Sequence, residues 1–84
     1  MDAFNGTLLR NGQVLSEGVN GRLSVDQLPS GEVAWTGFFA LPPGGYVELG
    51  DVLDLALDDG RSCKIKVERV NQTNAGMSVS FGRP

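Results

Sequence analysis

The spacing of glycine-containing turn signals is the feature that most restricts the fold of this chain. Twelve of its 84 residues are glycine, about twice the usual share, and most of them separate short apolar runs. Within these runs apolar and polar residues alternate, and no stretch longer than a turn repeats its apolar residues at helical spacing. The pattern predicts short strands joined by tight turns, with little helix.

Two Asn-Gly pairs are typical of hairpin turns. Asn11-Gly12 suits a two-residue turn, because both positions of that turn need a positive φ angle, and it joins the apolar runs 4–10 and 13–16. Asn20-Gly21 repeats the signal. We expect this second pair to be a turn that opens a strand over residues 22–28.

Pro29-Ser30-Gly31 has the composition of a three-residue hairpin loop, in which glycine takes the left-handed third position. A loop of this length places Val25 opposite Trp35. The alternation then points Leu23, Val25, Val33 and Trp35 toward the core.

Asp58-Asp59-Gly60 repeats the same loop chemistry. With these three residues as the loop, Leu55 lies opposite Cys63 and Asp54 lies opposite Lys64 on the outer face. The break in alternation after Glu68 predicts a bulge near Arg69.

The remaining segments complete an all-β chain. Residues 41–45 contain two prolines and two glycines, so we expect them to cross one end of the fold, with a short edge strand over 46–49. A loop over 71–76 precedes the last strand. The result is one domain over residues 1–84, a small antiparallel barrel or two-layer sandwich of six or seven short strands joined by tight turns.

The residue types that carry most enzyme chemistry are scarce. The chain has no histidine, and its one cysteine, Cys63, cannot form an internal disulfide or a zinc cluster. Five acids gather in twelve residues, but their spacing does not match a calcium loop and suits a turn; they are Glu48, Asp51, Asp54, Asp58 and Asp59. We therefore expect no catalytic residues, no metal site and no cofactor.

Charge and cysteine usage bear on partners and location. The formal net charge of −3 disfavours a nucleic-acid binder, because such proteins usually carry a basic excess. The first residues lack a basic and an apolar targeting segment, and no apolar run is long enough to span a membrane. We expect a cytoplasmic protein without membrane contact.

Two surfaces are candidate binding sites. The first is apolar and unusually aromatic for a loop region, and it is either a lid on the fold or an exposed patch for a partner; its residues are Phe38, Leu41, Tyr46 and Val47. The second is a basic stripe on one strand, which offers nucleotide or nucleic-acid binding as the alternative function; its residues are Arg61, Lys64, Lys66 and Arg69. The leading hypothesis is a non-catalytic interaction or adaptor module that binds another protein or a second copy of itself.

The run from Gly50 to Val70 loosely resembles the strand pair of PilZ domains, small barrels that bind cyclic dinucleotide. That family requires an Arg-x-x-x-Arg pair and an Asp/Asn-x-Ser-x-x-Gly turn. Asp26 and Gly31 fit the outer positions of the turn, but Leu28 replaces its serine and no arginine pair precedes it. The chain is therefore not assigned to that family.

Overall fold

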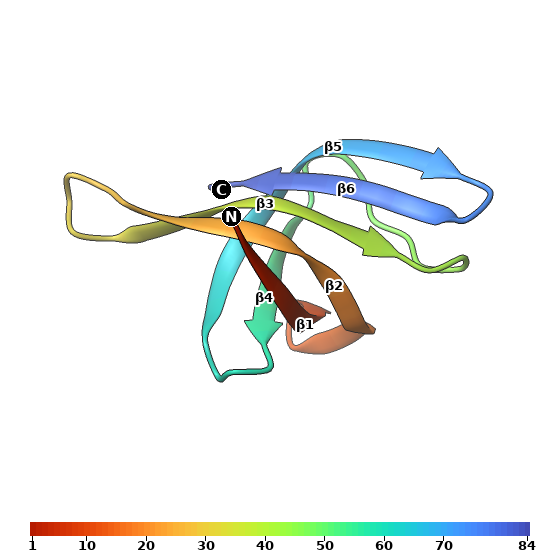
Figure 1. Ribbon diagram of the computed structural model, residues 1–84, viewed down its shortest axis with the longest axis horizontal. Helices are drawn as coiled ribbons and strands as arrows, with labels where there is room; N and C mark the ends of the chain where they lie inside the picture. The colour runs from red at the N-terminus through yellow and green to blue at the C-terminus, as the bar shows by residue number, and fades with distance from the viewer.

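The computed structural model describes residues 1–84, which form a closed barrel of six antiparallel strands (Figure 1). The strands are β1 (Asp2–Arg10), β2 (Gln13–Gln27), β3 (Val33–Leu41), β4 (Val52–Leu57), β5 (Ser62–Thr73) and β6 (Gly76–Gly82). Around the barrel their order is β1-β2-β3-β6-β5-β4, and pairing of β1 with β4 closes the ring. The predicted all-β class is confirmed, and the barrel is the alternative that the chain adopts. The structure has no helix long and apolar enough to cross a membrane.

The turn predicted at Asn11-Gly12 and the two predicted Xaa-Xaa-Gly loops form hairpins. Asn11 and Gly12 both have positive φ angles, 51° and 82°, between the paired residues Arg10 and Gln13. Gly31 has a φ of 90°, and the Leu28 amide donates to the Glu32 carbonyl across the loop at 2.7 Å. These geometries confirm the first hairpin and the first three-residue loop.

The β4–β5 hairpin has the register that its loop length predicts. Leu55 pairs with Cys63, and Asp54 pairs with Lys64. Gly60 has a φ of 96°. Since the three-residue loop sets this register, all three leucines of β4 fall on the inner face and are buried.

Alternate residues of all six strands fill the barrel interior. Three phenylalanines pack together there: the ring of Phe81 meets that of Phe4 edge-on at 6.5 Å between centroids, and it lies 5.7 Å from the ring of Phe39. The remaining core residues are aliphatic apart from Trp35 and Met77. They are Leu8, Val19, Leu23, Trp35, Leu41, Val47, Leu53, Leu55, Leu57, Ile65, Val67, Met77 and Val79.

The predicted bulge is present in β5. The register against β6 shifts between Val67 and Arg69, so Glu68 is the extra residue. Strict alternation would place Val67 and Val70 on opposite faces of β5. With the extra residue between them, Val67 is buried and Val70 also packs against the core.

The predicted turn at Asn20-Gly21 is wrong. Both residues lie inside β2, where Gly21 pairs with Phe4 on one side and Phe39 on the other. A Cβ atom at Gly21 would overlap the carbonyl oxygen of Phe38. The glycine is therefore explained by the close approach of β3 rather than by a turn.

Two boundaries also differ from expectation. The crossing segment predicted over 41–45 is longer, since β3 ends at Leu41 and residues 42–51, which include the expected edge strand over 46–49, form no strand. The expected loop over 71–76 is shorter, because β5 continues to Thr73 and pairs there with Gly76. The second difference lies within one hairpin, because β5 and β6 pair through residues close in sequence on either side of the turn.

We predict that Gly60→Val destabilises the protein by about 1–2 kcal/mol, because a β-branched side chain resists positive φ. No atom lies within 4 Å of a Cβ built at this position, so backbone strain is the expected cause. Urea unfolding followed by circular dichroism measures the change. Gly60→Asn is the control and should lose less, and an equal loss for both variants would contradict the explanation.

We predict that Trp35→Ala costs about 3–5 kcal/mol, because the single tryptophan is buried with 3% of its surface exposed. Such a loss is a large share of the stability of about 5–15 kcal/mol typical of domains. The fluorescence of the folded wild type should also be blue-shifted relative to the urea-unfolded chain. A solvent-like emission maximum before unfolding would show that the indole is hydrated.

Candidate interaction surface

The β2–β3 hairpin extends beyond the rest of the barrel. Residues 24–27 and 33–36 pair only with each other, since β1 pairing ends at Leu23 and β6 pairing ends at Gly37. Figure 1 shows this hairpin projecting at the left, past the other strands. It contributes to the elongated outline of 40 × 25 × 23 Å. We call residues 24–36 the arm.

The arm carries an apolar face that the barrel does not cover. Val25 pairs with Trp35 as predicted, and Trp35 is buried together with Leu23. Farther out, however, Val25 and Val33 are 45% and 54% exposed, so the prediction that both are buried is wrong. The alternation correctly places them on the inner side of the sheet, but neither β1 nor β6 extends far enough to cover them.

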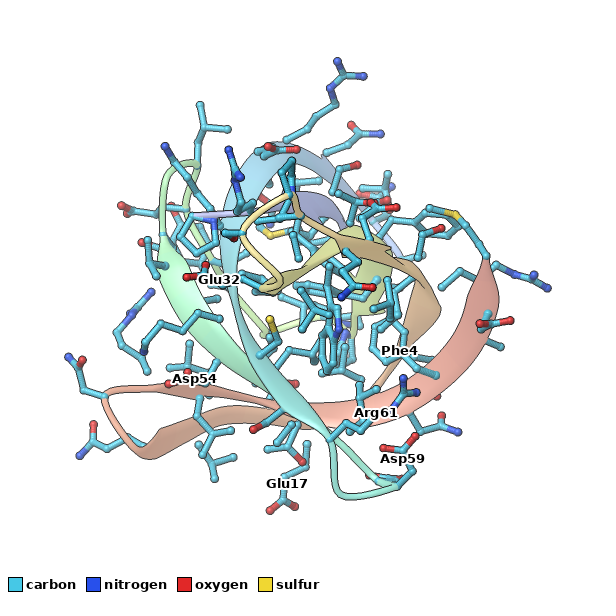
Figure 2. All side chains as sticks on the ribbon, turned by 90° about the vertical axis from the view of Figure 1, so that its left-hand side faces the viewer. Phe4, Glu17, Glu32, Asp54, Asp59 and Arg61 are labelled. Atoms are coloured by element: carbon cyan, nitrogen blue, oxygen red, sulfur yellow. The ribbon has the colours of Figure 1, made fainter.

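A charged group lies at the base of the arm. Arg61, in the β4–β5 loop, pairs with Asp59 at 2.9 Å, and its guanidinium carbon lies 5.9 Å from the centroid of the Trp35 ring. Hydrogen bonds from Arg61 hold the pKa of Asp59 below its usual value. Figure 2, viewed from the arm, shows this pair at the rim near Phe4, with Glu32 and Asp54 on the other side.

The four residues of the predicted basic stripe do not form one surface of unpaired positive charge. Arg61 pairs with Asp59, and Lys64 lies 3.2 Å from Asp54, as its strand register predicts. Lys66 and Arg69 form no ion pair and are exposed on β5. Two of the four charges are thus partly neutralised by neighbouring carboxylates.

The predicted apolar patch is divided between the core and the surface. Leu41 and Val47 are 3% and 1% exposed and close the end of the barrel, whereas Phe38 and Tyr46 are 43% and 61% exposed. Phe38 is on β3, opposite Arg22 and Ser80. The segment therefore contains both a lid and two exposed aromatic residues, and the role of these two in partner binding stays a prediction.

The lid is held in place through Asp51. Its carboxylate accepts a bond of 2.6 Å from the Arg10 guanidinium and one of 2.9 Å from the Glu48 amide. Backbone bonds from Gly50 to Val67 and from Val67 to Asp51, each 2.8 Å, fix the same loop to β5. Tyr46 donates to Glu48 at 3.3 Å, and the charge of this carboxylate raises the pKa of Tyr46.

The other sequence candidates for chemistry are dispersed. No three potential metal ligands gather in one place, and of the five clustered acids three form ion pairs with arginine or lysine. Cys63 is partly buried against the core beside the backbone of Trp35.

The exposed residues of the arm were missed at the sequence level. Alternation indicates which face of the sheet a side chain lies on. Whether other strands cover that side chain depends on the relative lengths of the neighbouring strands. Here β2 has 15 residues and β1 has nine. A length comparison could have found the arm, but the false turn at Asn20-Gly21 divided β2 and hid the difference.

In comparisons with known proteins, no family model matches the chain, and no curated protein or solved structure shows significant similarity to it.

We predict that Cys63 is alkylated several-fold more slowly in the folded protein than in the denatured chain at pH 8. Burial raises the pKa of its thiol, so the reactive thiolate fraction at this pH is smaller in the fold. Iodoacetamide labelling followed by mass spectrometry measures both rates. The midpoint of the rate against pH should also lie higher for the folded protein, and a faster folded rate would contradict the prediction.

Proposed function

We propose that this barrel is a non-catalytic protein-interaction module and that the arm is its binding surface. The observation that carries the proposal is the apolar face that continues outward from buried Leu23 and Trp35 to uncovered Val25 and Val33. Adjacent exposed apolar residues are typical of protein-binding sites. Covering Val25 and Val33 with a partner would extend the core that the barrel already has.

The backbone of the arm supports the same function. A two-stranded ribbon is only marginally stable by itself, and over residues 24–27 the edge of β2 that faces away from β3 has no strand partner. Such an edge accepts an extended segment through main-chain hydrogen bonds. Asp26 is the only charged residue along these four positions, so the edge has little protection against pairing.

The non-catalytic part of the proposal rests on the composition, which lacks histidine, and on the dispersal of the acids and Cys63. The alternative of nucleic-acid binding has less support, since Arg61 and Lys64 are paired with carboxylates. It would show itself as a salt-dependent affinity for single-stranded oligonucleotides.

We predict that Val33→Ser weakens binding to a partner protein by about tenfold or more, because it replaces an apolar contact by a hydroxyl. The partner is first identified by cross-linking in cells, then purified and titrated by calorimetry. Val14→Ser is the matched control, since Val14 is 53% exposed and Val33 is 54% exposed, both on strands.

The control variant should bind like the wild type, and both variants should keep the wild-type melting temperature. Hydrogen exchange in residues 24–36 should slow when the purified partner binds. Unchanged affinity for both Val33→Ser and the double variant Val25→Ser/Val33→Ser would overturn the assignment of the arm as the binding surface.

A further inference from the structure

The largest hollow on the surface lies on the wall of the barrel that includes β5. It has a volume of about 500 Å³ and is lined by Leu49, Gly50, Lys66, Val67, Glu68 and Arg83. We call it the groove. Its walls are fixed, because Gly50 is hydrogen-bonded to Val67 and the bulge at Glu68 sets the course of β5.

The groove and the arm have complementary charge and similar apolar content. Lys66 and Arg83 form no ion pair, and the exposed side chain of Leu49 lies beside them. Glu68 is the single acid in the groove, which leaves an excess of positive charge. The arm has two acids, Asp26 and Glu32, and residues 24–36 contain no lysine or arginine.

The two surfaces are not in contact within one molecule. The acids of the arm, Asp26 and Glu32, form no ion pair with Lys66 or Arg83. The groove lies beside the base of the arm, because Gly37 pairs with Phe81, two residues before Arg83. Figure 1 shows the arm projecting past the end of β6, so its outer part is free to meet the groove of another molecule.

We propose that the arm of one molecule docks against the groove of a second copy of this chain. Val33 and Val25 would meet the apolar side chain of Leu49, while Asp26 and Glu32 face Lys66 and Arg83. The inference rests on the proposed function of the arm and names a partner for it.

Such a contact joins two different surfaces, the arm and the groove, and this determines the symmetry of the assembly. An interface between unlike surfaces is head-to-tail, so it produces a ring or a growing chain of molecules rather than a closed symmetric pair. Because exposed charges contribute, association should weaken as salt is added.

Analytical ultracentrifugation of charge-reversed variants tests the proposal. Association of the wild type should rise with concentration and extend beyond the dimer. The variants Asp26→Lys/Glu32→Lys and Lys66→Glu/Arg83→Glu should each associate about a hundredfold more weakly, since like charges then face each other. An equimolar mixture of the two variants should associate again, because the acidic arm of the groove variant meets the basic groove of the arm variant.

The matched control is Glu17→Lys/Asp58→Lys, which changes the net charge by the same amount as the arm variant at positions outside residues 24–36 and outside the lining of the groove. It should associate like the wild type. A wild type that stays monomeric at 1 mM, a groove variant that still associates, or a mixture that stays monomeric would each overturn the proposal.

These outcomes are separable from failure of the proposed function. If the wild type is monomeric but Val33→Ser still loses binding to a purified partner of different sequence, only the self-association is wrong. If Val33→Ser changes neither binding nor self-association, the arm has no role in either.

Discussion

The close approach of neighbouring backbones at glycine is the constraint on which the rest of the barrel depends. Six strands enclose a narrow interior, so the sheet must bend sharply. At Gly6, Gly21 and Gly37 a Cβ atom would run into the backbone of the adjacent strand. Gly6 lies where β1 pairs with β4, and Gly21 and Gly37 both lie where β2 pairs with β3. Closure of the ring and burial of the phenylalanine cluster depend on the curvature that they permit.

The sequence predicts the local part of this fold well. The register of the β4–β5 hairpin follows from the three residues of its loop, and the bulge near Arg69 follows from a break in alternation between adjacent residues. Asn20-Gly21 shows where such reasoning fails. The same dipeptide serves a turn at residues 11 and 12 and a tight crossing at residues 20 and 21, and only a contact with a distant strand distinguishes them.

The candidate surfaces were harder to predict than the fold. Apolar content alone does not separate Leu41 and Val47, which complete the core, from Tyr46, which is exposed between them. For Val25 and Val33 the face was correct but the burial was not, because burial depends on how far β1 and β6 extend. For Lys64 the predicted contact is correct, because strand register alone places this side chain beside Asp54.

The pairing of β1 with β4 also limits how early the chain can fold. β1 forms a hairpin with β2 from residues close in sequence, but its other edge has no partner until β4, which ends at Leu57, has been synthesised. Contacts between such distant segments slow folding, because a long loop must close before they are gained. The free edge of β3 waits longer still, because its partner β6 ends at Gly82. Until both edges are paired, the nascent chain exposes unpaired backbone and apolar side chains, which favours its aggregation.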